Sequence, residues 1–375
     1  MSNLMHSLSG KISMEPGLSN SYNRLAVQIW LFILLLLIFF MILVGGLTRL
    51  TDSGLSITDW APIMGAFPPI SLRDWMHLFN EYQKTSEFVL QNNTMTLEEF
   101  KYIFWWEWGH RQFGRLIGLV WFLGFIFLNY ITSMPRFLFM SGLFLGVLGL
   151  AQAFIGWWMV KSGLNSEETM LDVASYRLAI HLSLALIIFS MVYFLIRING
   201  AWPDEPAPKK SVDRISVEEI LTNLFLGGFF VQVFLGALVS GIDAGQSYTD
   251  WPLMNGKIVP EDIFYLVPGY TNFLENPALV QFNHRLMGYL LFILGTIIWM
   301  RGIRKVNLYP DQKINYHLLF GLLSLQVIIG IFALLNSVPL YLGLAHQLVA
   351  ILLLLSILNL KFNLYNERRG KVPSK

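Results

Sequence analysis

Apolar side chains fill eight long stretches of this chain, and polar segments separate them. The stretches run roughly over residues 25–47, 105–130, 136–160, 176–198, 219–240, 278–300, 314–336 and 340–361. Each is long enough to cross the hydrocarbon core of a bilayer as a helix. The pattern therefore predicts an all-α polytopic membrane protein with eight transmembrane helices. The first stretch is too long for the core of a signal peptide, so we expect a retained span.

The chain also contains the same pattern twice. Residues 45–60 align without a gap with residues 236–251 at an offset of 191, and eight of the sixteen positions are identical. The spans that follow continue the repeat in the same order. The matched pairs are His110 and His284, Arg111 and Arg285, Gly114 and Gly288, Gln152 and Gln326, Gly156 and Gly330, and His181 and His346. Because each copy has an even number of spans, the repeat predicts two pseudo-symmetric four-helix bundles in the same orientation.

We divide the chain accordingly into five parts. They are an N-terminal cytoplasmic segment (1–23), an N-terminal four-helix half (24–199), a cytoplasmic linker (200–218), a C-terminal four-helix half (219–362) and a C-terminal cytoplasmic tail (363–375). This arrangement puts sixteen of the 26 Lys and Arg residues on the side of the termini. Because basic residues are retained on the inner side of a membrane, both termini are predicted to be cytoplasmic. The long polar loops 48–104 and 241–277 then face outward.

The amino-acid composition limits the kinds of site and the location that this chain can have. Hydrophobic residues make up 55% of the chain and charged residues only 13%, about half the charged share of a soluble domain. Cysteine is absent, which excludes disulfides and thiolate metal sites. The net charge is only +2, and the basic residues form no face for nucleic acid. The absence of a transit peptide favours a bacterial inner membrane over an organelle.

Four histidines lie inside the predicted spans at similar depth. They are His110, His181, His284 and His346, two in each copy of the repeat. An ionisable group at such a depth marks a functional site by default. The other three histidines, His6, His77 and His317, have no counterpart in the repeat and are expected to be ordinary solvated or interfacial residues.

Three interpretations of the four histidines compete. Each could make a hydrogen bond between helices, but four at one depth and two per repeat speak against this. A bare metal ion such as zinc needs three or four ligands, and the repeat reproduces only a pair. A haem iron needs only two axial imidazoles. We therefore expect each pair, 110 with 181 and 284 with 346, to lie on neighbouring helices within reach of one iron.

Two charged residues accompany the first histidine of each pair. Arg111 and Arg285 are candidate partners for haem propionates, or else anchors at the outer surface. Glu107 lies one helical turn outward of His110, whereas its counterpart near His284 is Gln281. A carboxylate in the first half only predicts chemistry in that half, with Glu107 accepting a proton or stabilising positive charge. A solvated carboxylate at the membrane border is the alternative.

The sequence at these positions resembles the haem A synthase family. The similar segments are EWGHR at 107–111, residues 45–60, IGWWMVKSGL at 155–164, FNHR at 282–285 and AHQ at 345–347. The resemblance covers about residues 24–362, and the absence of cysteine is similar to the alphaproteobacterial and mitochondrial branch. It implies two haem sites. His284 and His346 would bind a haem b cofactor, and His110 and His181 would bind the substrate haem O.

The resemblance further implies an oxidoreductase that converts a methyl group of haem O to the formyl group of haem A, with water as the oxygen source and Glu107 essential. It implies delivery partners such as haem O synthase or cytochrome oxidase assembly factors, a lipid environment and, as one arrangement, a homo-oligomer. The main alternative is a cytochrome b-type electron-transfer subunit with two bis-histidine haems. That alternative is disfavoured because both pairs lie near the outer face.

Overall fold

The computed structural model describes residues 16–132, 134–164, 172–200, 215–305 and 310–368. Within these residues, eight helices are long and apolar enough to cross a membrane, as the sequence predicts. They are α1 (Pro16–Leu50), α4 (Leu97–Ile131), α5 (Arg136–Gly163), α6 (Ser175–Gly200), α7 (Val217–Gly241), α9 (Pro277–Ile303), α10 (Pro310–Leu335) and α11 (Leu340–Arg368). Short helices α2 (Leu72–Tyr82), α3 (Ser86–Leu90) and α8 (Asn272–Glu275), with 3₁₀ turns at Met64–Ala66, Ala244–Gln246 and Gly269–Thr271, lie in the two large loops.

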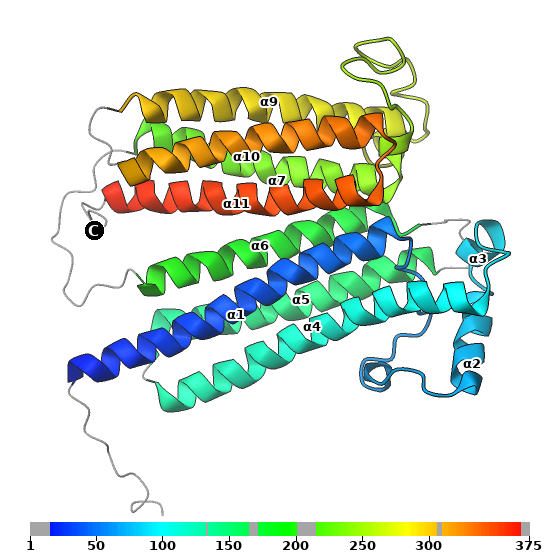
Figure 1. The fold of residues 1–375 in the computed structure, drawn as a ribbon, viewed down its shortest axis with the longest axis horizontal. Coiled ribbons are helices and arrows are strands. Elements are labelled where there is room, and N and C mark those ends of the chain that lie inside the picture. The colour runs from blue at the N-terminus through cyan, green and yellow to red at the C-terminus, as the bar shows by residue number, and fades with distance from the viewer. Residues whose placement is uncertain (1–15, 133, 165–171, 201–214, 306–309, 369–375) are drawn as a thin grey trace, which may run out of the picture.

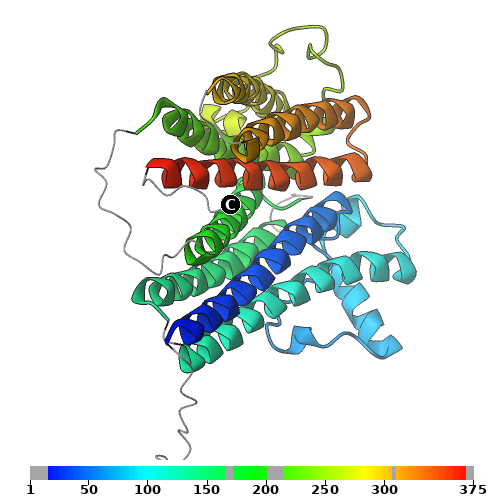
Figure 2. The same cartoon turned by 60° about the vertical axis from the view of Figure 1, so that its left-hand side comes forward.

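The long helices form two four-membered rings that lie side by side (Figures 1 and 2). In the first ring, α1 packs against α4 and α6, and α5 completes the ring between α4 and α6. In the second, α9 and α11 both pack against α7 and α10. The rings meet where α6 contacts α7 and where α11 contacts α1. The sequence repeat relates α1 to α7 and α6 to α11, so it converts each of these two contacts into the other. A pseudo-twofold axis between the rings requires this relation.

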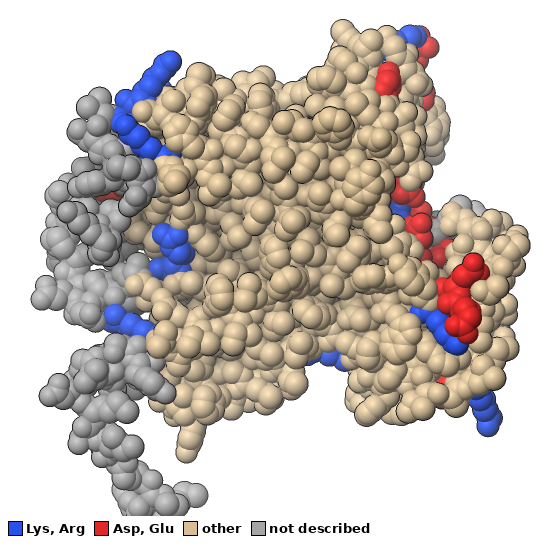
Figure 3. Space-filling model, in the orientation of Figure 1, with Lys and Arg blue, Asp and Glu red and all other residues tan. Residues whose placement is uncertain are grey.

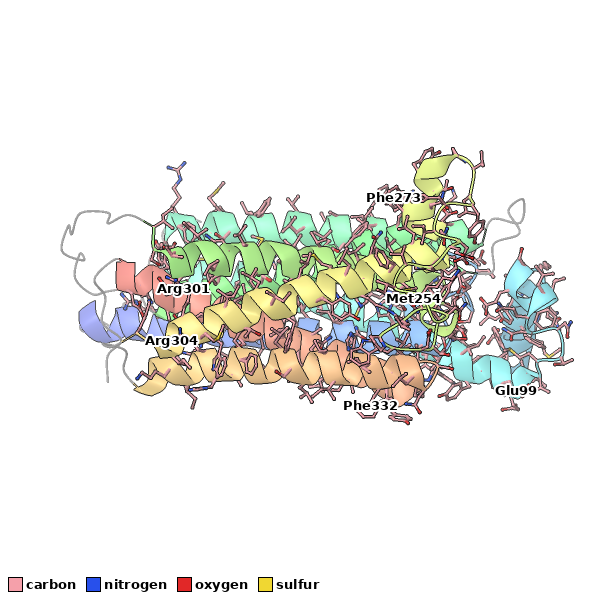
Figure 4. All side chains as sticks on the ribbon, turned by 90° about the horizontal axis from the view of Figure 1, so that it is seen from above. Glu99, Met254, Phe273, Arg301, Arg304 and Phe332 are labelled. Atoms are coloured by element: carbon pink, nitrogen blue, oxygen red, sulfur yellow. The ribbon has the colours of Figure 1, made fainter. Side chains whose placement is uncertain are left out.

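Charge separates the two ends of the rings. On the face in Figure 3, Asp and Glu gather at the end that carries the large loops, and most of the helical surface between the ends is uncharged. Arg301 and Arg304 lie at the opposite end from the loop residues Glu99, Met254 and Phe273 (Figure 4). This arrangement suits helices surrounded by lipid, where a charged side chain is costly. Residues 1–15 of the N-terminal segment and residues 201–214 of the linker lie outside the described residues, whereas residues 16–23 belong to α1.

Helix α4 begins eight residues earlier than the apolar pattern predicts, at Leu97. Thr96 caps it, because the Thr96 hydroxyl accepts a bond from the Glu99 N–H and the Glu99 carboxylate accepts one from the Thr96 N–H. This reciprocal arrangement is a capping box, and its Thr-x-x-Glu spacing is visible in the sequence. The extension carries α4 beyond the other helices into the first outer loop, where it packs against α2.

The first outer loop has a hydrophobic core of its own. The buried residues Trp75, Phe79 and Tyr82 of α2 pack against Phe100 and Phe104 of α4. Ile57 also packs against this core, which fixes the loop on one end of the first ring.

A buried carboxyl group makes this loop sensitive to pH. Burial raises the pKa of Glu87 to about 7, although the Tyr82 hydroxyl donates a bond of 2.8 Å to the carboxylate. The folded loop therefore binds a proton more tightly than the unfolded loop. The free energy of unfolding of the loop is therefore greatest below about pH 4.5. It falls as the pH rises through about 7, by at most roughly 3 kcal/mol.

We expect hydrogen-exchange protection factors of α2 and the start of α4 to fall between about pH 5 and pH 8. Glu87→Gln keeps the acceptor for Tyr82 but cannot ionise, so it should remove this dependence. A variant whose protection factors fall as steeply as those of the parent would show that another group is responsible.

Candidate functional site

Each of the four repeated histidines packs against a glycine of the preceding long helix. A Cβ atom on Gly45 would lie 3.2 Å from Nε2 of His110, and one on Gly236 would lie 2.9 Å from Cε1 of His284. Gly156 and Gly330 stand in the same relation to His181 and His346, at 2.9 and 2.8 Å from Cε1. Each glycine thus leaves room for an imidazole between two helices. The local geometry repeats in both halves, as the sequence predicts.

The histidines of each pair do not lie on neighbouring helices. The helices that carry them, α4 with α6 and α9 with α11, face each other diagonally across their rings and share no extended contact. The expectation of neighbouring helices is therefore wrong. Two helices in direct contact would leave no room for a flat ligand between their side chains.

Three glutamine amides contact the histidines from neighbouring helices. Gln152 Nε2 lies 3.3 Å from His181 Nδ1 and donates to the His181 carbonyl at 3.0 Å. Gln326 Nε2 lies 3.0 Å from His346 Nε2, in agreement with the repeat. Gln232 Nε2 lies 3.3 Å from His284 Nε2, a contact that the sequence interpretation missed. The sequence signal for this contact was Gln232 itself, a single polar side chain in the middle of an apolar span.

Several buried polar atoms around the pairs have no hydrogen-bond partner among the described residues. They are Oε1 of Gln152, Gln232 and Gln326, and Nδ1 of His284 and His346. Buried polar atoms are nearly always hydrogen-bonded, so this concentration suits a site completed by a ligand. Among the described residues, no group of three His, Asp or Glu side chains could hold a bare metal ion. Two imidazoles, glycine-lined space and apolar walls fit a haem, whose macrocycle supplies the other ligands.

Glu107 is buried and holds the first outer loop in place. Its Oε2 accepts bonds from the Ser56 hydroxyl at 2.8 Å and the Ile57 N–H at 2.7 Å. Its Oε1 accepts a bond from Arg111 Nη2 at 2.5 Å, and Arg111 Nη2 also donates to the Ile57 carbonyl. These three donors contact both oxygens of the carboxylate. Glu107 is therefore not a solvated residue at the membrane border.

In the second half, Gln281 makes the equivalent contact with the outer loop, but it donates hydrogen bonds to the loop where Glu107 accepts them. The Gln281 amide donates to the carbonyls of Ala244 at 2.7 Å and Tyr248 at 3.2 Å. Its Oε1 accepts a bond from Arg285 Nη2 at 2.8 Å. Arg285 also donates to the carbonyls of Tyr248 and Leu253. Part of the difference between Glu107 and Gln281 thus reflects the loop backbone, which presents donors in one half and acceptors in the other.

The remaining histidines behave as the sequence predicts where they are described. His77 is exposed on α2. His317 accepts a bond from the Trp299 indole at 3.1 Å. His6 lies outside the described residues.

Arg49 joins the two halves at their outer ends. Its Nε and Nη2 donate to the carbonyl of Ser240 at 3.1 and 2.7 Å, and it pairs with Asp52 at 2.6 Å and Asp243 at 3.0 Å. Asp172, which precedes α6, lies 3.5 Å away. Arg49 and Ser240 occupy matched positions of the repeat, as do Asp52 and Asp243. Burial raises the pKa of Asp52 and of Asp172, although Arg49 opposes the effect in both.

Because Arg49 and Ser240 occupy equivalent positions of the repeat, an arginine at either position should hold the two halves together. Arg49→Ser leaves three carboxylates without their cation and should destabilise the contact between the halves by about 1–2 kcal/mol. Adding Ser240→Arg to Arg49→Ser should restore most of the lost thermal stability in detergent. A double variant as unstable as Arg49→Ser alone would contradict the pseudo-twofold relation of these positions.

Fold and site together define a class: a multi-pass helical membrane protein with a glycine-flanked pair of half-buried histidines in each of two related bundles. The COX15-CtaA family, described as "Cytochrome oxidase assembly protein", matches residues 28–358. The chain belongs to this family, as its sequence motifs predict.

Three relatives illustrate the match. The haem A synthase of Dinoroseobacter shibae is 48% identical over 93% of this chain and 91% of the relative. That of Roseobacter denitrificans is 43% identical over 93% of this chain and 91% of the relative. That of Maricaulis maris is 45% identical over 91% of this chain and 96% of the relative. The similarity extends over both bundles and is not confined to the histidine motifs.

Proposed function

We propose that this protein is a haem A synthase that oxidises a ring methyl group of haem O to a formyl group. The observation that carries the proposal is the pair of matched, glycine-flanked histidine sites, of which only the first has a buried carboxylate one turn away. A second observation, membership of the family whose relatives are haem A synthases, supports the reaction. A purely electron-transferring cytochrome b is not favoured, because the relatives that match nearly the whole chain are haem A synthases.

The two sites have different roles in this proposal. His110 and His181 would hold the iron of haem O, and His284 and His346 would hold haem b. Haem b, when bound, supplies an acceptor for electrons removed from the substrate. Arg285, whose buried Nε has no partner, and its counterpart Arg111 would lie near the haem propionates. Carboxylates suit the planar guanidinium group.

The reaction balances with water as the oxygen source. A methyl group and one water molecule give a formyl group, four protons and four electrons. The C–H bonds of the methyl group break, and bonds to one oxygen form. Glu107 would stabilise positive charge that develops at the methyl carbon, because its donors hold the carboxylate in a fixed position. The electrons would leave through the second haem to an acceptor in the membrane.

We further propose the bacterial inner membrane as the location, with both termini cytoplasmic. The end that carries the large acidic loops and both histidine pairs would then face outward. Haem O synthase or a cytochrome oxidase assembly factor would deliver the substrate or take the product.

Pigment extraction from the purified protein tests the proposal directly. The protein, made in a host that also makes haem O, should yield haem b together with haem O or haem A when the extract is analysed by mass. The expected ratio is about one haem b to one substrate or product haem, one for each bis-histidine site. An extract with haem b in both sites, and no conversion of added haem O, would favour the electron-transfer alternative.

A further inference from the structure

Residues 60–72 of the first outer loop form a stretch without a charged side chain. Several of its large apolar side chains are strongly exposed, among them Ile63 at 78%, Phe67 at 71% and Ile70 at 89%. We call this stretch the apolar segment. A protein surface that faces water rarely gathers so many exposed apolar side chains, and such a patch marks contact with an apolar partner. The depth of the segment along the membrane normal indicates which partner that is.

Hydrogen bonds hold the apolar segment against α4. Gln112 Nε2 donates to the Gly65 carbonyl at 2.9 Å. Arg115 donates to the Pro62 carbonyl at 3.1 Å and to the Ala61 carbonyl at 3.2 Å. The chain between α1 and α2 therefore turns back beside α4 before α2 begins (Figures 1 and 2).

These bonds lie at membrane depth. Arg115 precedes Ile131, the inner end of α4, by sixteen residues, which corresponds to about 24 Å of helix. The hydrocarbon core is about 30 Å thick, so the bonded carbonyls lie in its outer part. Arg115 also shares a helix face with Leu119, Phe122 and Ile126, which are all exposed. The apolar segment thus covers the outer end of a face that meets lipid further inward.

The second bundle presents bare side chains to the surroundings at this level. The offset of 174 that relates His110 to His284 matches Gln112 with Leu286 and Arg115 with Tyr289. Leu286 and Tyr289 are both exposed, and an apolar and an aromatic side chain suit the border of the membrane. The two polar side chains of the first bundle need partners at the same depth, and the carbonyls of the apolar segment supply them.

The second outer loop differs in charge at the corresponding place. Residues 252–263, which follow the second copy of the repeated motif, carry Lys257, Glu261 and Asp262, and Lys257 pairs with Glu261. Ile258 is exposed in the same stretch. Charged side chains are costly to place in lipid, so this stretch belongs in water. The two outer loops therefore meet different surroundings.

We propose that the apolar segment inserts into the outer leaflet of the membrane beside α4, where Ile63, Met64 and Phe67 contact the acyl chains of the lipids. Irregular backbone at membrane depth must have its polar groups satisfied by protein, and Gln112 and Arg115 satisfy the carbonyls of this turn. The proposal goes beyond the proposed function and does not depend on which haem each bundle binds.

Insertion would anchor the loop that contacts Glu107. Arg111, between Glu107 and Gln112 on α4, donates to the carbonyls of Ile57 and Asp59. The Ile57 N–H donates to the Glu107 carboxylate. The chain continues from these residues directly into the apolar segment, so lipid contacts would hold the backbone around Glu107 from its outer side.

The absence of cysteine allows a nitroxide label to be placed at one chosen position. Met64→Cys is labelled in the full chain, reconstituted into phosphatidylcholine vesicles, and studied by electron paramagnetic resonance. Its label should collide more with oxygen, which concentrates among acyl chains, than with a water-soluble nickel chelate. Labelled Leu119→Cys gives the lipid reference, and labelled Ile258→Cys gives the water reference. The oxygen-to-nickel ratio at position 64 should lie near that of Leu119→Cys.

Two outcomes would overturn the proposal. A label at position 64 that collides mainly with the nickel chelate, as at Ile258→Cys, would place the apolar segment in water. A label that neither reagent reaches would show that a second copy of the chain covers the segment in place of lipid.

A second variant tests the bonds that hold the segment at this depth. Arg115→Leu removes the donors to Ala61 and Pro62, so the oxygen-to-nickel ratio at Met64→Cys should shift toward the water reference. Arg73→Leu removes an exposed arginine just beyond the apolar segment and should leave the ratio unchanged. The label of Leu119→Cys should keep its lipid value in the Arg115→Leu background, which shows that α4 stays in place. An unchanged ratio at position 64 in that background would contradict the role of Arg115.

Discussion

Glu107→Gln is expected to retain bound haem and to lower haem A formation by roughly a hundredfold or more, the range typical of a lost charge-stabilising or proton-accepting group. Glutamine keeps one acceptor oxygen but removes the negative charge beside the first histidine pair. Haem O or a partly oxidised intermediate should accumulate in its place. The measurement is the ratio of haem O to haem A extracted from membranes, normalised to the amount of protein.

The contacts of Glu107 require a control for structural damage. The new amide N–H₂ would face donors from Ser56, Ile57 or Arg111, and one unmet contact should cost about 1–3 kcal/mol of local stability. Ser56→Ala removes one donor and keeps the carboxylate. It should therefore weaken the loop contact while it preserves most haem A formation. If Ser56→Ala abolishes haem A formation as completely as Glu107→Gln, the role of Glu107 is to hold the loop.

Replacing one histidine in each bundle should remove a different haem. His110→Ala takes one axial ligand from the first site and should abolish haem O binding and haem A formation, while haem b remains. His284→Ala should remove haem b and leave haem O bound but unconverted, because its electrons lose their acceptor. In both variants, the loss should exceed about tenfold. Absorption spectra and haem extraction of the purified variants give the result.

The glycine contacts supply a second, gentler pair of variants. Gly45→Ala and Gly236→Ala would place a methyl group about 3 Å from His110 and His284, respectively. Each should shift the absorption spectrum of one haem and not the other. Equal loss of both haems from either variant would show that the bundles do not bind their haems independently.

The order of spans and the repeat were readable from the sequence because a bilayer imposes them. A lipid-facing helix must be apolar along its length, so the eight stretches stand out without any knowledge of their packing. The repeat predicted the pairing of His110 with His181 and of His284 with His346, since each half carries one histidine on its second long span and one on its fourth. The capping box at Thr96 was also readable, but the apolar pattern alone placed the start of α4 too late.

Only the tertiary structure decided how these residues meet. The diagonal arrangement of α4 and α6 depends on the order of helices around the ring, which hydropathy does not encode. The contact of Gln232 with His284 and the bonds from Ser56 and Ile57 to Glu107 join residues that lie about 50 positions apart, on helices and loops whose rotation is set by packing.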